Sequence, residues 1–172
     1  HKDFPIDVFQ TGSGTSTNMN VNEVISNIAK SKFKTDIHPN DHVNMSQSSN
    51  DVIPTAISHC AYKEAVTKLL PSLSILSKDI GKKQKKLNNI VKTGRTHLMD
   101  AMPITFGQEI SSWKAQIDDN IDSLKSCLKR VKRLPIGGTA VGTGINAHKQ
   151  FSKEFLAALN SGNKLNYVNK HN

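Results

Sequence analysis

Three short polar stretches of the sequence combine side chains that could bind and transform a small anion. They contain Gly12-Ser13-Gly14-Thr15, Ser48-Ser49-Asn50 and Thr96-His97. The first two stand directly before predicted helices, whose free N–H groups and positive ends favour negative charge. A histidine moves protons near neutral pH. Hydroxyls, amides and one histidine suit a small dicarboxylate, and the same donors would stabilise an oxyanion-rich intermediate.

Each stretch also has a structural interpretation that needs no ligand. A turn followed by an N-cap explains the first stretch, and a capping box explains the second. Asp51 is expected to cap a helix or orient a neighbour rather than act as a base. A lone histidine is more often structural than catalytic. Arg95 could hold a carboxylate in bidentate fashion or form a structural ion pair.

Composition and missing motifs exclude several classes of function. The sequence has no nucleotide-binding glycine loop, no nucleophile elbow and no cluster with metal-ligand spacing. Cys60 and Cys127 predict two reduced thiols rather than a disulfide framework. The net charge is +9, but the densest lysine cluster, Lys82–Lys86, lacks interleaved aromatic residues, so nucleic-acid binding is not expected. No apolar run is long enough to cross a membrane.

Two long amphipathic stretches must position the polar stretches, which are themselves expected to form loops. Apolar residues recur every three or four positions from Phe106 to Leu134, which predicts a long helix with a heptad-like apolar stripe. A second helical pattern runs from Pro54 to Leu87, where Pro71 is expected to kink or divide the helix. Such helices need partners, so a mainly α bundle is predicted. Shorter elements are expected at Asn22–Lys30 and Lys149–Asn160, both helical, and at Ile6–Phe9, a strand.

Four longer strings resemble the class II fumarases of the fumarase/aspartase superfamily. They are QTGSGTSTNMNVNEVI (residues 10–25), HPNDHVNMSQSSND (38–51), GRTHLMDAMPITFGQE (94–109) and IGGTAVGTGIN (136–146). Three positions favour a fumarase, because aspartases typically have Ala, Thr and Gln where this chain has Ser13, Ser49 and His97. An aspartate ammonia-lyase is the alternative within the superfamily.

The resemblance implies reversible hydration of fumarate to L-malate, a step of the tricarboxylic acid cycle, through an aci-carboxylate carbanion and without a cofactor. Thr96 and His97 would be catalytic, with His97 as a proton carrier. The implied substrate-binding residues are Ser13, Thr15, Ser48, Ser49, Asn50, Thr96 and His97. The family's second dicarboxylate site is matched by His38, Asn40 and Asp41, for which a purely structural loop is the alternative.

The resemblance also implies the architecture, a mainly α long-helix bundle. Residues 1–53 would end an N-terminal domain that carries the substrate loops, and residues 54–172 would begin the central helical-bundle domain. The family forms homotetramers whose active sites combine regions from different subunits. A cytoplasmic location is expected, and a mitochondrial one stays open because the N-terminal segment is missing.

One hallmark of the family is absent from these residues. It is the Gly-Ser-Ser-x-Met-Pro loop that supplies the catalytic serine. We therefore expect the chain to be an internal fragment that is inactive alone. A catalytically incomplete helical scaffold is the third possibility.

Overall fold

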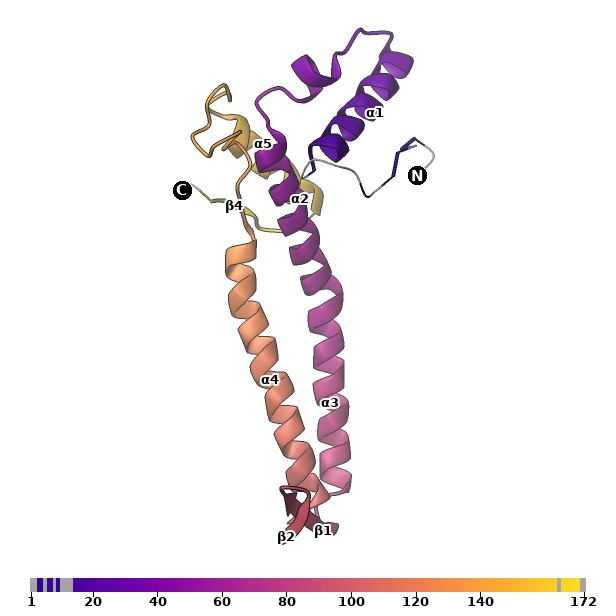
Figure 1. Ribbon diagram of the computed structural model, residues 1–172, viewed down its shortest axis with the longest axis vertical. Coiled ribbons are helices and arrows are strands. Elements are labelled where there is room, and N and C mark those ends of the chain that lie inside the picture. The colour runs from indigo at the N-terminus through magenta and orange to yellow at the C-terminus, as the bar shows by residue number, and fades with distance from the viewer. Residues whose placement is uncertain (1–2, 5, 8, 10–13, 164, 171–172) are drawn as a thin grey trace. The chain divides into compact units, whose positions relative to one another are not determined.

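The computed structural model describes residues 3–4, 6–7, 9, 14–163 and 165–170, and the chain divides into two compact units. One unit combines His1–Cys60 with Val131–Asn172, and the other is Ala61–Arg130 (Figure 1). Long helices dominate both units, so the mainly α prediction is confirmed. The proposed domain boundary after residue 53 stays a prediction.

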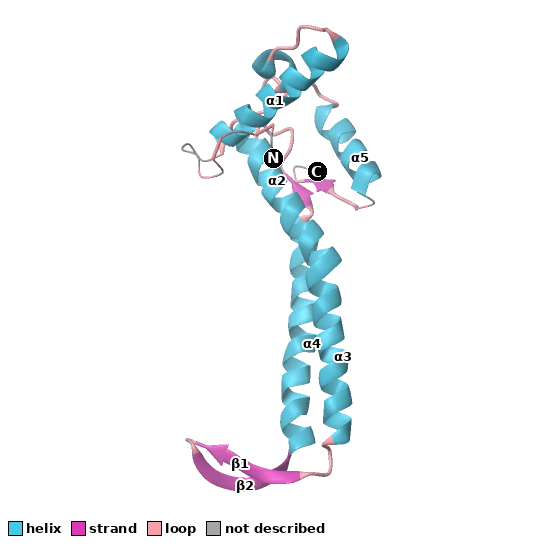
Figure 2. Cartoon of the chain, turned by 90° about the vertical axis from the view of Figure 1, so that its right-hand side faces the viewer, coloured by secondary structure: helices cyan, strands magenta, loops and turns pink. Residues whose placement is uncertain are grey.

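The Ala61–Arg130 unit is a pair of long helices closed at one end by two strands. Helix α3, Leu70–Lys86, and helix α4, Phe106–Val131, lie side by side (Figure 2). A hydrogen bond of 2.5 Å from the Ser77 hydroxyl to Asp118 Oδ1 joins them. The buried aliphatic residues of α4 all belong to the predicted apolar stripe: Ile110, Ile121 and Leu128.

The interruption expected at Pro71 takes the form of a wider helical turn. Helix α2, Ser49–Glu64, continues through the π-helical turn η2, Ala65–Leu69, into α3. Proline has no N–H to donate, and its ring crowds the carbonyl four residues earlier. A π-helical turn directly ahead of Pro71 relieves that crowding while the helical path goes on.

The loop predicted around Thr96 and His97 is wrong, because this stretch is a β-hairpin. Strand β1, Val91–Thr96, pairs antiparallel with β2, Met99–Thr105. Gly94 sits at an irregularity of the pairing, where an added Cβ would lie 2.7 Å from the Met102 carbonyl oxygen. Gly94 and Pro103 weaken the strand pattern in the sequence, and both are tolerated at irregular or edge positions.

In the other unit, helix α1, Thr15–Phe33, begins seven residues before the predicted Asn22. Its buried residues are polar and stand four positions apart: Asn18, Asn22 and Ser26. Asn44 Oδ1 accepts hydrogen bonds from the amides of Asn18 and Asn22, at 3.1 and 3.0 Å. The Ser26 hydroxyl donates to the Ile37 carbonyl. A search for apolar periodicity misses this helix face because amides and a hydroxyl are what it buries.

Three further elements complete this unit. The π-helical turn η1, Pro39–Val43, follows α1, and helix α5, Phe151–Asn163, lies where Lys149–Asn160 was predicted. A short parallel pair joins β3, Arg133–Leu134, to β4, Val168–Asn169. The hydrophobic core of this unit contains Leu134, Ile136, Leu156 and Tyr167. The strand predicted at Ile6–Phe9 is wrong at residues 6, 7 and 9, and residue 8 lies outside the described residues.

Candidate active site

The first residues of two helices meet through their hydroxyl groups. Thr15 opens α1, Ser49 opens α2, and Thr15 Oγ1 lies 3.1 Å from Ser49 Oγ. Gly14 makes this approach possible. Its φ is +100°, and a Cβ there would lie 2.7 Å from Ile53 Cγ1. Two positive helix ends and two hydroxyls therefore stand together, which favours a carboxylate.

The segment 48–51 caps α2 with its own side chains. Asp51 Oδ1 accepts a hydrogen bond from the Ser48 N–H at 2.9 Å, and Ser48 Oγ accepts one from the Asn50 N–H at 3.3 Å. The capping alternative is thus confirmed for Ser48 and Asp51. The Asn50 side-chain amide also donates to Ser48 Oγ, at 3.3 Å. Asn50 is exposed at the helix start.

The glycine-rich segment near residue 137 lies against this cap. The second oxygen of Asp51, Oδ2, accepts hydrogen bonds from the backbone N–H groups of Gly137 and Thr139, at 3.0 and 2.8 Å. Only 2% of Asp51 is exposed. The sequence assigns no site role to Gly137 or Thr139, and its one signal for them is the string IGGTAVGTGIN.

A pocket of about 270 Å³ is lined by residues 46–48 on one side and by residues of the glycine-rich segment on the other. Its lining contains hydroxyls and amides and no charged side chain: Ser46, Gln47, Ser48, Thr139, Ala140, Ile145 and Asn146. Thr139 Oγ1 is buried and finds no hydrogen-bond partner in the part of the chain that the structure describes. Neutral donors around a small hollow suit a small polar or anionic guest.

Thr96 and His97 lie at the tip of the β-hairpin. Thr96 pairs with Met99, so His97 and Leu98 are the two central residues of the turn. Both have positive φ, 48° and 62°, as a type I′ turn requires. Gly and Asn favour that conformation, and Leu adopts it at a cost in strain that is typical of functional sites. Leu98 is 95% exposed.

The predicted catalytic residues thus lie on the Ala61–Arg130 unit, whereas Thr15 and Ser48–Asn50 lie on the other. Ser13 lies outside the described residues. The structural alternative is confirmed for Arg95, whose Nε lies 3.1 Å from Asp100 Oδ1 in an exposed ion pair.

His38, Asn40 and Asp41 form an exposed local network at η1. His38 Nδ1 accepts a hydrogen bond from the Asp41 N–H at 3.1 Å. Asp41 Oδ2 lies 3.3 Å from the same nitrogen, and Asn40 Nδ2 donates to Asp41 Oδ1 at 3.2 Å. These contacts shape the turn, and the second dicarboxylate site stays a prediction.

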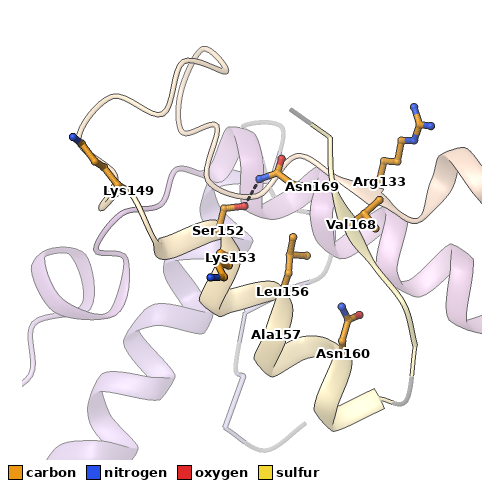
Figure 3. A pocket seen from close by; sticks show the side chains of 9 residues that line it. All are labelled: Arg133, Lys149, Ser152, Lys153, Leu156, Ala157, Asn160, Val168 and Asn169. Carbon is orange, nitrogen blue, oxygen red and sulfur yellow. Dashed lines mark hydrogen bonds between the residues drawn. The ribbon is translucent and has the colours of Figure 1, made fainter. Parts of the chain in front are cut away.

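A larger pocket, of about 740 Å³, lies beside α5 and β4. Within it the Asn169 amide donates to the Ser152 hydroxyl (Figure 3). That hydroxyl donates in turn to the Ile136 carbonyl. The side chains of Arg133 and Lys149 point away from one another at opposite ends of the view. Lys153 is a third cation in the lining of this pocket.

The described part of the chain has neither a metal-binding cluster nor a membrane-spanning helix. There, no group of three His, Cys, Asp or Glu residues is arranged to hold a metal ion. Nor does any helix of that part combine the length and apolar character needed to cross a membrane.

Comparison with known proteins identifies the relatives of this chain. A family model described as "Lyase" matches residues 1–172. The chain is 52% identical over 170 residues to the class II fumarate hydratase of Xylella fastidiosa, covering 99% of this chain and 36% of that protein. It is 54% identical over 156 residues to that of Mycobacterium tuberculosis, covering 91% and 33%. The resemblance stated from the sequence is confirmed.

Two solved structures share the fold. The class II fumarase of Schistosoma mansoni superposes with a TM-score of 0.87 at 43% identity, over 95% of this chain and 35% of that one. A Brucella melitensis protein described as fumarate lyase:delta crystallin, in its native form, gives a TM-score of 0.79 at 32% identity, over 99% and 39%. The chain therefore spans little more than a third of the length of these relatives.

Proposed function

This chain belongs to the lyase family, and we propose that the protein hydrates fumarate reversibly to L-malate, as its class II relatives are named for doing. The observation that supports this most directly is the 3.1 Å approach of the Thr15 and Ser49 hydroxyls at two helix N-termini. This arrangement offers a dicarboxylate several neutral donors and two positive helix ends.

In this proposal the unit that contains Thr15 and Ser49 binds the substrate, and the β-hairpin carries the residue that moves protons. Thr15, Ser49 and the exposed Asn50 amide donate to one carboxylate of the substrate, with Ser48 shaping their segment. Ser13 joins them by resemblance. The reaction removes a proton from the carbon next to that carboxylate, which leaves an aci-carboxylate. Because the donors are already oriented, they stabilise its added negative charge without reorganisation.

Thr96 and His97 serve the hydroxyl side of the reaction. His97 carries the proton that lets the hydroxyl group leave as water, directly or through a bound water, and takes it back in the reverse direction. The resemblance gives the carbon proton to a serine of a Gly-Ser-Ser-x-Met-Pro loop. That motif does not occur in these residues, so we propose that residues 1–172 do not turn over substrate alone. A second dicarboxylate site at His38, Asn40 and Asp41 is part of the same proposal.

We also propose a homotetramer in which one subunit supplies Ser48–Asn50 and another supplies Thr96 and His97 to a shared site. Two observations support it. The two groups lie on separate units of the chain. The paired helices α3 and α4 leave large apolar side chains exposed, including Ile75 at 62% and Trp113 at 53%. Partner helices would cover that surface. A cytoplasmic location is proposed, with mitochondria as the alternative.

The test is a rate assay on the complete polypeptide that contains this sequence. Fumarate formation would be followed by its ultraviolet absorbance, with L-malate and L-aspartate offered in parallel. We expect fumarate from malate alone. Fumarate from aspartate would identify an aspartate ammonia-lyase instead. Inactivity with both substrates would favour a helical scaffold without turnover.

A further inference from the structure

We propose that Asp51 is a positioning residue for the substrate-binding segment Ser48–Asn50. Its carboxylate ties this segment to the glycine-rich segment Gly137–Thr139. The glycine-rich segment thus contributes to the site by binding the Asp51 carboxylate rather than the substrate. The inference rests on the proposed function, because it assigns the tie a role in substrate binding.

The hydrogen bonds of Asp51 define the tie. One oxygen accepts from the Ser48 N–H, at 2.9 Å, and the other accepts from the N–H groups of Gly137 and Thr139. The last two donors are 86 and 88 residues away in sequence. Within the described residues no lysine, arginine or histidine forms an ion pair with this carboxylate. Backbone donors alone satisfy a side chain that is 2% exposed.

The glycine-rich segment is shaped to receive a carboxylate. Gly137 and Thr139 have positive φ, 89° and 55°, and so point two N–H groups at one oxygen. Successive backbone N–H groups in such conformations form concave anion sites. Gly137 cannot be replaced without movement, because a Cβ there would lie 2.7 Å from the Cβ of Ser152. The Asp51 carboxylate occupies this concavity, so these two N–H groups are not expected to bind the substrate.

The Ser48 segment depends on this tie for its placement. Asn50 bonds the Ser48 hydroxyl within the segment, and Ser49 contacts Thr15 of α1. The preceding Ser46 accepts a hydrogen bond from the His148 N–H. The bonds to Gly137 and Thr139 anchor the same cap to a distant part of the unit. Their loss would allow Ser49 and Asn50 to leave the geometry in which they meet Thr15.

Asp51→Asn tests the tie with almost no change in shape. An amide has one acceptor oxygen and one NH₂ group. If the oxygen faces Gly137 and Thr139, the NH₂ faces the Ser48 N–H; in the opposite orientation it faces the other two. Either way donors oppose each other in a buried place. We expect KM for L-malate to rise roughly tenfold or more, with a smaller change in kcat.

Gly137→Ala attacks the same tie from its far end. The new Cβ would push against Ser152 and displace the Gly137 N–H from Asp51. We expect a KM increase in the same direction, although residue 137 is not among the proposed substrate-binding groups. This variant also keeps the test decisive if Asp51→Asn fails to fold.

Thr55→Val is the matched control. Thr55 lies one turn along α2 and is 5% exposed, and its hydroxyl has no hydrogen-bond partner among the described residues. The substitution keeps the shape and leaves the tie intact, so KM is expected to stay at the parent value. Hydrogen exchange of peptides covering residues 46–50 and 137–142 should increase in Asp51→Asn and not in Thr55→Val.

The outcomes separate the two proposals. A purely structural role would lower the amount of active enzyme and hence Vmax, while KM of the remaining sites stays unchanged; that result in both tie variants overturns the positioning role. Unchanged hydrogen exchange overturns the tie itself, whatever the substrate. A parent protein inactive on malate refutes the proposed function and with it the role in substrate binding.

Discussion

Thr15 and Ser49, which are 34 residues apart in sequence, place their hydroxyl oxygens 3.1 Å from each other at the first residues of α1 and α2. This contact joins the first two polar stretches into one group of donors. Three predictions follow from the proposed reaction and from the contacts around this group, a fourth from the contacts of Asp118, and a fifth from the proposed assembly.

Replacing Ser49 with alanine should weaken substrate binding. The variant removes one hydroxyl that donates to a charged carboxylate, an interaction of about 1.5–3 kcal/mol, so KM for L-malate should rise roughly tenfold to a hundredfold. Steady-state kinetics on the complete polypeptide measures it. Ser123→Ala, at an exposed position of α4, is the matched control. Equal KM values for both variants would contradict a role for Ser49.

Replacing His97 with asparagine should lower kcat and change KM little. Loss of a positioned proton carrier typically costs about 10²–10⁴ in rate. The control is His148→Asn, because His148 has no role in the proposed chemistry and its ring accepts a hydrogen bond from the nearby Gln150 N–H. The kcat of each variant would be compared across pH. A His97 variant that keeps parent kcat would show that the hairpin tip serves another purpose.

Gly14→Ala should destabilise the first unit by about 2 kcal/mol or more, since it combines positive-φ strain with a steric clash. The clash is with Ile53, 2.7 Å from the new Cβ. Gly142 is a matched control, because its φ is +89° and nothing lies within 4 Å of an added Cβ. Denaturant unfolding of both variants separates strain from clash. Equal losses would mean that the contact with Ile53 contributes nothing.

The stability contributed by Asp118 should vanish in acid. Hydrogen bonds from the Lys114 ammonium and then from the Ser77 hydroxyl lower the pKa of this carboxyl. A lowered folded-state pKa stabilises the fold above the ordinary value near ~4, and the gain disappears as pH falls through the lowered pKa. Asp118→Asn should therefore reduce Tm at pH 7 and have a shrinking effect towards pH 3.

The neighbouring substitution Asp119→Asn is the control for that measurement. Asp119 is exposed, and its carboxylate forms no ion pair with any described residue. The Tm of the Asp119→Asn variant should equal the Tm of the parent protein at both pH 7 and pH 3. An Asp118 effect that is the same at pH 3 and pH 7 would contradict an electrostatic origin.

Mixing two impaired variants should restore activity if subunits share active sites. Ser49→Ala and His97→Asn damage different units of the chain. Mixed tetramers would contain some sites with the intact Ser49 of one subunit and the intact His97 of another. Co-expression with two tags, followed by the malate assay, checks this. No recovery in verified mixed tetramers would show that each site is built within one subunit.

How much the sequence predicts depends on how local the cause is. The α4 stripe is predicted because its period lies within one helix, and Ile110, Ile121 and Leu128 are buried as expected. The start of α1 is missed because its first turns bury Asn18 and Asn22 instead of apolar residues. Apolar periodicity carries no information about amide contacts.

The hairpin and the Asp51 tie escape prediction for different reasons. A type I′ turn is normally recognised in a sequence by Gly or Asn at its two central positions, whereas this turn has His97 and Leu98 there. The bonds from Asp51 to Gly137 and Thr139 span more than eighty residues, so only the folded chain reveals them. The candidate residues themselves were found by local motif and resemblance, which need no tertiary information.

The amide contacts of α1 have a consequence for how this part of the chain responds to heat. Asn44 accepts hydrogen bonds from the side-chain amides of Asn18 and Asn22, and the Ser26 hydroxyl donates to the Ile37 carbonyl. Separating α1 from the turn that follows it therefore exposes mainly polar surface. Exposed apolar area raises heat capacity, and exposed polar area lowers it. Detachment of α1 would therefore change the heat capacity far less than unfolding of the aliphatic core around Leu134 and Ile136.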